Sequence, residues 1–259
     1  MSLFADWCDA AKQQDKRKHF WALTEKAGGR ESIRGGLAAT MRSHYDRHER
    51  IADDVARLGY AGASEIFRTL LPRTKKARSG ELGEILATEL VEEETGFRVP
   101  VRRLRYKDGR EMALRGDDFI GAAYDKEDKL WLLKGEAKSN KTLGKTTITE
   151  AREALSRYGG RCTPESLLFV ANHLLESTDP DDQELGRTMR DEVGCRALRP
   201  HRIDHMLFTL SGNAPPPALK ADLDAASVDR THYTVNLRVE DHQEFIAVMF
   251  EEAQKLGDC

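Results

Sequence analysis

The sequence has few cysteines and none of the common cysteine motifs. Its four cysteines are Cys8, Cys162, Cys195 and Cys259, and none belongs to a CxxC pair. Neither a zinc knuckle nor a disulfide framework is therefore indicated, and reduced thiols in the cytoplasm are expected. The N-terminal residues lack the apolar core of a secretory signal, and no apolar run approaches the ~18 residues of a transmembrane helix. We expect a cytoplasmic protein that does not enter a membrane.

Nucleotide-binding and hydrolase motifs are also lacking. The sequence contains no GxxxxGK[ST], GxGxxG or GxSxG pattern, so this chain is not expected to bind a nucleotide or to use a serine nucleophile. A general excess of positive charge is absent too, because 41 Lys and Arg face 44 Asp and Glu for a net charge of −3. Binding to nucleic acid, if it occurs, must depend on local charge and on a defined site.

The hydrophobic pattern divides the chain in two. Residues 1–72 are predicted to form a helical region, interrupted at Gly28-Gly29 and ended by Pro72. An apolar helix around Phe4 and Trp7 could dock onto another subunit. Residues 73–259 are predicted to form the second unit. It begins with a basic connector, 73–78, and contains strands and helices in turn.

The second unit is predicted to be an α/β domain with a mixed sheet flanked by helices. A helix is predicted over 81–93, three strands follow it, and a second helix is predicted over 147–158. Lys107-Asp108-Gly109-Arg110 is typical of a hairpin turn between the first two strands. Further helices are expected at 163–176, 182–193 and 241–256. The strands are expected at 97–106, 119–124, 129–138, 206–210 and 233–239, with a loop at 211–217.

Three charged residues mark a candidate site in this domain. Asp118 opens one predicted strand, and Glu136 and Lys138 end the next. Side chains alternate along a strand, so Glu136 and Lys138 share a face and Ala137 points away. Antiparallel pairing of the two strands would bring Asp118 beside Glu136. The arrangement predicts a carboxylate pair next to an ammonium group.

This set suits phosphodiester hydrolysis assisted by Mg²⁺, or by Mn²⁺. Carboxylates are ligands that hard divalent cations prefer, so Asp118 and Glu136 are predicted metal ligands, with the backbone carbonyl of Ala137 as a third. The metal would polarise the phosphoryl group and activate water. Lys138 would hold or deprotonate that water and offset the charge of the transition state.

A further acid could come from the helix before the sheet. Glu81 and Glu84 are three residues apart and share a helix face. Either could reach the metal, or both could simply favour the positive end of the helix dipole. We prefer Glu84 as the site residue and leave Glu81 as the alternative.

The sequence around these residues resembles that of a known protein family. The segments are RSGELGE, RGDDFIGA and LLKGEAKS. Their order and content resemble the PD-(D/E)XK nuclease superfamily and, within it, the HamA family of bacterial Hachiman anti-phage defence. The resemblance implies a restriction-endonuclease-like core and a DNA-degrading effector that works with a separate, HamB-like helicase subunit. It also implies that Glu84, Asp118, Glu136 and Lys138 are the site residues. Gly116-Asp117 replaces the proline of the superfamily name, which leaves Asp117 open as an alternative to Asp118.

Positive charge concentrates near the candidate site. Residues 98–147 contain 13 Lys or Arg against 8 Asp or Glu. Such charge contacts phosphates without reading sequence, and no base-reading motif is present. The predicted DNA-binding residues are Arg102, Arg103 and Arg105 on the first hairpin, and Lys141 and Lys145 after the third strand.

The favoured hypothesis is thus a metal-dependent DNA nuclease with little sequence specificity, restrained by a helicase partner. Two alternatives stay open. A standalone restriction-type endonuclease would recognise a sequence and yield discrete fragments. A non-catalytic DNA-binding subunit would keep the same fold, although three charged site residues would then bring a desolvation cost without a use.

Overall fold

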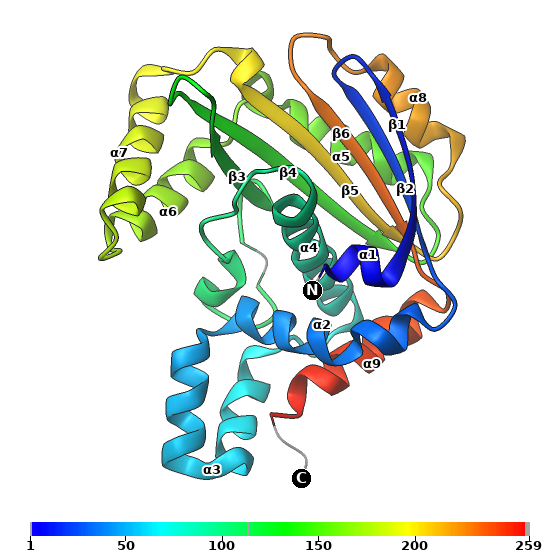
Figure 1. Cartoon of the computed structure of the whole chain (residues 1–259), viewed down its shortest axis with the longest axis vertical. Helices are drawn as coiled ribbons and strands as arrows, with labels where there is room; N and C mark the ends of the chain where they lie inside the picture. The colour runs from blue at the N-terminus through cyan, green and yellow to red at the C-terminus, as the bar shows by residue number, and fades with distance from the viewer. Residues whose placement is uncertain (1, 113, 257–259) are drawn as a thin grey trace.

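The molecule is built around one six-stranded sheet. The structure is a computed structural model and describes residues 2–112 and 114–256. The strand order is β1-β2-β6-β5-β4-β3, and helices lie on both faces (Figure 1). The strands are β1 (Cys8–Asp15), β2 (Lys18–Glu25), β3 (Phe119–Tyr124), β4 (Leu130–Asn140), β5 (Ile203–Ser211) and β6 (His232–Arg238).

The centre of the sheet is parallel and its edges are antiparallel. Strands β2, β6, β5 and β4 run in one direction, whereas β1 and β3 run against their neighbours. β5 is buried along its whole length, as is usual for a parallel strand covered on both faces. In register, Glu136 of β4 lies opposite Leu207, and Lys138 lies opposite Thr209. The expected mixed sheet between helices is confirmed.

One face of the sheet carries the larger core. It is covered by four helices that contribute apolar residues such as Leu37, Leu86 and Phe245 against Phe208 of β5. Trp7 is part of this core and lies 5.3 Å from the ring of Phe245. These helices are α1 (Leu3–Trp7), α2 (Gly29–Tyr45), α4 (Lys75–Glu94) and α9 (His242–Gln254).

The opposite face carries two smaller cores. Leu207 packs there with Ile148 and Leu219, while Leu132 packs with Leu167 and Met189. The covering helices are α5 (Lys145–Ser156), α6 (Pro164–Leu175), α7 (Pro180–Cys195) and α8 (Pro217–Ala225). The short 3-10 turn η2 (Arg157–Gly160) joins α5 to α6, and η3 (Pro200–Arg202) leads from α7 into β5.

Helix α3 (His48–Leu70) extends away from the sheet (Figure 1). It folds back on itself at Gly59, whose φ of 71° lies in the left-handed region that glycine adopts without steric penalty. None of the helices in the described ranges has the length and apolar character needed to cross a membrane.

The expectation of an all-helical N-terminal region is wrong at residues 8–25. These residues form the β1–β2 hairpin, and β2 pairs in parallel with β6 near the other end of the chain. The sheet is thus continuous across the boundary expected at residue 72. The sequence of β1 does not show the alternation of apolar and polar residues that predicts a strand. Such an alternation requires one buried face, and β1 exposes seven of its eight residues. Phe4 and Trp7 are buried inside the molecule rather than available to another subunit.

Four other expectations need correction. Residues 97–106 do not form a strand: they are extended with a single bridge, Arg98 to Ala122, and end in the 3-10 helix η1 (Arg103–Tyr106). The predicted first hairpin is therefore absent. The helical region expected over 1–72 has a further interruption after Tyr45, where α2 ends before α3 begins at His48. The basic connector expected over 73–78 is mostly helical, because α4 begins at Lys75. A helix that was not predicted, α8, begins at Pro217, the last residue of the expected loop.

Candidate functional site

The three residues expected to form the site meet where β3 begins and β4 ends. The backbone N–H of Asp118 donates to Gly135 O at 3.2 Å, which fixes the first pair of the β3–β4 ladder. The Asp118 carboxylate accepts a 2.7 Å hydrogen bond from the backbone N–H of Ala137. Lys138 Nζ donates to Glu136 Oε1 at 2.6 Å. The strand alternation and the Asp118–Glu136 proximity expected from the sequence are both observed.

Helix α4 brings Glu84 to the same place. The helix packs closely on β4, because Gly83 has no side chain: a Cβ there would lie 3.3 Å from Ser139 Cβ. Ser79 Oγ donates to Ser139 Oγ at 2.8 Å and ties the helix to the strand end. A cavity of about 550 Å³ opens between them, lined among others by Glu84, Asp118, Ala137 and Lys138.

Burial raises the pKa of all three carboxylates, and the charge of Asp118 adds to the shift of the other two. Burial, and then the charge of Asp118, raise the pKa of Glu136 to about 7. The same two causes raise the pKa of Glu84 well above its usual value. Burial also raises the pKa of Asp118, although the Ala137 N–H and the charge of Lys138 oppose it. Three acids crowded in this way would each be stabilised in the charged form by an added cation.

Lys138 remains protonated in this environment. Burial lowers its pKa, but the charge of Glu136 and the hydrogen bond to it outweigh burial, and the net shift is upward. Lys138 therefore provides a fixed positive charge at the end of β4, beside the acids.

The structure separates Asp117 from Asp118. Asp117 accepts from the backbone N–H of Thr163 at 2.7 Å and pairs with Lys134 Nζ at 3.5 Å. Both partners are almost fully buried, at 3% and 1% side-chain exposure. This pair fastens β3 and β4 to the start of α6, whereas Asp118 faces the cavity. The choice of Asp118 is consistent with this geometry.

Glu81 and Glu84 are separated in a similar way. Glu81 accepts from the Tyr45 hydroxyl at 2.7 Å and forms an ion pair with Lys107. Its charge is thus already compensated within the protein. Glu84 faces Asp118, and no ion pair to it occurs among the described residues. Lys107 was expected in a basic hairpin turn, and its pairing with Glu81 was not foreseen because it depends on the fold of 97–110 rather than on a local motif.

A preformed metal site is not observed. Within residues 2–112 and 114–256, no three His, Cys, Asp or Glu side chains are arranged so that they could hold one ion. Glu136 is held by Lys138, and Asp118 by the Ala137 N–H, so the acids are satisfied inside the protein. Binding of a cation would require at least the Glu136 side chain to turn away from Lys138.

The predicted DNA-binding residues fall into two groups. Arg102 pairs with Glu92 at 2.6 Å, Arg103 donates to Arg115 O at 2.6 Å, and Arg105 donates to Ser43 O at 2.7 Å. These three arginines make internal contacts and do not form an exposed cluster on a hairpin. Lys141 and Lys145 are exposed where β4 leads into α5, as expected. Lys76, which was not predicted, also lines the cavity.

Comparison with known proteins places the whole chain in one family. The family model for HamA matches residues 1–253. The chain is also similar to the Hachiman protein HamA of Bacillus cereus, with 23% identity over 251 residues, which cover 94% of this chain and 87% of that protein. The match includes the β1–β2 hairpin, α4 and the strands that carry Asp118, Glu136 and Lys138. The chain belongs to the HamA family.

Proposed function

We propose that this protein is a metal-dependent DNA nuclease with little sequence specificity, acting as the effector of a bacterial anti-phage defence of the Hachiman kind. The observation that carries the proposal is that Glu84, Asp118 and Lys138 line one cavity, with Glu136 paired to Lys138 and close enough to Asp118 that the charge of Asp118 raises its pKa. The name of the Bacillus cereus relative supports the link to Hachiman. A partner helicase would restrain or direct the nuclease.

The donor chemistry of the cluster fits Mg²⁺ or Mn²⁺. Magnesium prefers oxygen ligands, and crowded carboxylates with raised pKa values gain from a neighbouring cation. Asp118 and Glu136 would hold the ion, with Glu84 and the backbone carbonyl of Ala137 as further ligands. When bound, a divalent ion lowers the pKa of water and stabilises charge on a phosphoryl oxygen.

The chain's own residues have distinct tasks in this proposal. Lys138 carries a positive charge that would bind a non-bridging phosphate oxygen and offset the charge gained in the transition state. Release of Glu136 from Lys138 would free both side chains for the substrate. The Ala137 N–H keeps Asp118 oriented towards the end of β4, with the 2.7 Å bond described above.

Exposed basic residues in and after the elements of the cavity support a DNA substrate. Lys76 lines the cavity from the first turn of α4, Lys141 directly follows β4, and Lys145 begins α5. Such residues contact backbone phosphates and do not distinguish bases. The proposed lack of sequence specificity follows from this type of contact.

Helix α3 supports the proposal of a protein partner. It exposes three large apolar side chains, Leu58 at 43%, Tyr60 at 51% and Ile66 at 37%. Exposed apolar residues grouped on one projecting element are typical of protein interfaces. The partner proposed here is a helicase subunit, which the sequence resemblance implies.

Plasmid cleavage tests the proposal. Wild type, Glu136→Ala and Lys138→Ala are incubated with supercoiled DNA and either Mg²⁺ or EDTA, with and without the helicase and ATP. We expect nicking or degradation only by the wild type with Mg²⁺, and a change in that activity when the helicase and ATP are added. Discrete fragments would instead favour a restriction-type enzyme. Gel shifts without any product under all conditions would favour the DNA-binding subunit.

A further inference from the structure

The two edges of the sheet differ in what covers them. At the β3 edge, the backbone groups of Arg98 and Ala122 exchange hydrogen bonds at 3.0 Å and 2.8 Å, so part of that edge is already paired. At the opposite edge, β1 pairs only with β2 in the described part of the chain. Seven of the eight residues of β1 are exposed. The β1 edge is therefore the more open of the two.

The direction of the backbone groups of β1 follows from its ladder with β2. The N–H of Lys26 donates to Trp7 O at 2.9 Å, so these two residues form a hydrogen-bonded pair just before β1 begins. Hydrogen-bonded and non-hydrogen-bonded pairs alternate along an antiparallel ladder. The even-numbered residues of β1 therefore turn their N–H and C=O groups away from β2. Outward backbone groups without a partner in the described residues are those of Ala10, Lys12 and Gln14.

The sequence of β1 does not protect this edge. Natural sheets protect long edges with proline, a bulge or a charge that points outward. β1 contains neither proline nor glycine, and it pairs with β2 from end to end without a bulge. The ammonium group of Lys12 is held within the molecule, because it pairs with Glu94 at 2.6 Å and lies 4.8 Å from the centre of the Trp21 ring. The edge is regular and free to pair.

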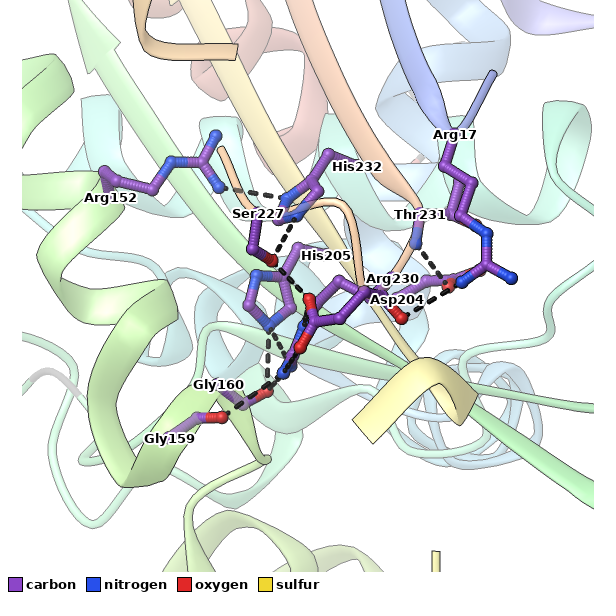
Figure 2. A network of polar contacts seen from close by, with 11 residues as sticks. Arg17, Arg152, Gly159, Gly160, Asp204, His205, Ser227, Arg230, Thr231 and His232 are labelled. Atoms are coloured by element: carbon purple, nitrogen blue, oxygen red, sulfur yellow. Dashed lines mark hydrogen bonds and ion pairs between the residues drawn. The ribbon is translucent and has the colours of Figure 1, made fainter. Parts of the chain in front are cut away.

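Both ends of the β1–β2 hairpin are anchored. Trp7, directly before β1, is buried in the larger core. In the turn after β1, Arg17 O accepts from the N–H of His232 at 2.8 Å, and Arg17 Nη1 donates to Asp229 O at 3.0 Å. Figure 2 shows Arg17 beside Thr231, which leads into β6. An edge that is already fixed loses little conformational entropy when another strand pairs with it.

We propose that β1 is a dimer interface, at which β1 of a second copy of this chain pairs antiparallel and extends the sheet across a two-fold axis. A two-fold contact uses the same patch on both subunits, so the strand must be complementary to itself. In the register centred on Ala11, Ala10 lies opposite Lys12 of the second copy. Asp9 then lies opposite Gln13 of the second copy. The inference does not rest on the proposed nuclease activity.

Charge and ladder length select this register. Outward groups must face outward groups, so even-numbered residues pair with even-numbered ones and only a few registers remain. A register centred on Lys12 would set the two Lys12 side chains opposite each other and Asp9 opposite Asp15, and like charges directly opposite are destabilising. Registers centred further towards either end leave Ala10 or Gln14 without a partner. The proposed register avoids both costs.

A single cysteine on the two-fold axis tests the register. Ala11 would face its own copy in a non-hydrogen-bonded pair, where Cα atoms lie about 4.5 Å apart and a disulfide can form. Gln13 is a matched control, because it is also exposed and lies on the same face of β1, but its two copies would lie about 13 Å apart along the strands. In full-length protein with Cys195→Ser and Cys259→Ser, mild oxidation should cross-link Ala11→Cys at least about tenfold faster than Gln13→Cys.

Substitution of Gln13 tests charge complementarity without a covalent bond. Gln13 would lie opposite Asp9 of the second copy, so Gln13→Lys should strengthen the dimer and Gln13→Asp should weaken it. Each dimer contains this contact twice, so the dimer Kd of the two variants should differ by about tenfold. A strand-edge contact is smaller than a standard interface, so sedimentation velocity is measured up to about 0.5 mM protein. Both variants should unfold at the same temperature as wild type, because Gln13 is exposed.

Three results would overturn the proposal. The first is a wild-type chain that stays monomeric over the whole concentration range, which would leave the edge to a strand of a different protein. The second is cross-linking of Ala11→Cys and Gln13→Cys at the same rate. The third is a dimer whose Kd is the same in Gln13→Lys and Gln13→Asp, which would place the contact on another surface.

Discussion

Two polar groups share one sheet but have opposite electrostatic character. At the end of β4, three carboxylates crowd together and their pKa values rise. At the start of β5 and β6, each arginine is matched by an aspartate and the histidines are neutral. This second, balanced group consists of the ion pairs Arg152–Asp222 and Arg230–Asp229 with the rings of His205 and His232 (Figure 2). In the first group, Glu136 is paired with Lys138, but Glu84 has no ion-pair partner among the described residues, whereas in the second group each arginine has its own aspartate. A carboxylate without a partner can gain from a cation supplied from outside, whereas a matched set of charges holds itself together.

The largest effect expected separates two neighbouring aspartates. Asp118→Asn should reduce DNA cleavage at least about a hundredfold, because it removes a proposed metal ligand worth several kcal/mol of transition-state stabilisation. Asp117→Asn should instead destabilise the fold by about 3–5 kcal/mol, because it leaves Lys134 buried without its partner. Cleavage rates and urea denaturation measure the two effects. Equal activity loss with equal stability in both variants would contradict this assignment.

The next effect is a gain in stability at low pH from the acid cluster. Glu136 has a pKa raised from 4.5 to about 7 by burial and Asp118. Its protonated form therefore stabilises the fold fully below pH 4.5, and this contribution is lost as pH rises through 7. Between pH 4.5 and 8, wild type should lose up to about 3 kcal/mol relative to Glu136→Gln. Chemical denaturation without metal at both pH values gives the difference. Parallel pH profiles for the two proteins would refute the raised pKa.

The balanced group should respond to pH with the opposite sign. The pKa of His232 falls from 6.5 to about 3 through burial and the charge of Arg152. The neutral ring thus stabilises the fold above pH 6.5, and this contribution is lost as pH falls towards 3. At pH 4.5, wild type should have lost about 2–3 kcal/mol relative to its value at pH 7.5. His232→Gln should lack this component, and an unchanged acid sensitivity would argue against it.

The smallest effect concerns the two exposed lysines that follow β4. Lys141→Ala and Lys145→Ala should each weaken DNA binding modestly and lower the slope of log affinity against log salt by about one. Arg102→Ala, a control whose side chain pairs with Glu92, should leave that slope unchanged and affect stability instead. Fluorescence anisotropy at several salt concentrations distinguishes them. A slope change for Arg102 alone would place the DNA on the other side of α4.

The sequence allowed the acid cluster to be predicted because its residues lie on three regular elements close in the chain. Asp118, Glu136 and Lys138 follow from strand alternation, and Glu84 from helix spacing. The β1–β2 hairpin was missed because β1 is exposed on both faces and its pairing with β6 is long-range. Asp117 and Asp118 are adjacent in sequence, so only the fold shows which one is paired with Lys134.

The arginine and histidine group could not be predicted from the sequence. Its members come from α5, η2, β5, α8, the segment before β6 and the first residue of β6, and no two of the cavity-lining side chains form a motif.

Arg102, Arg103 and Arg105 show the opposite case, in which a pattern in the sequence suggested a patch that the fold does not form. Their clustering in sequence indicated an exposed basic patch, but the irregular path of 97–110 turns them inward to carboxylates and carbonyls.

The most direct test of the nuclease centre compares wild type with Glu136→Gln on labelled double-stranded DNA in Mg²⁺. Glutamine keeps the size of the side chain and removes the charge. The account predicts that cleavage falls at least about a hundredfold while the protein at pH 8 is as stable as wild type or more stable. Undiminished cleavage by a folded Glu136→Gln protein would contradict a centre built on Asp118, Glu136 and Lys138.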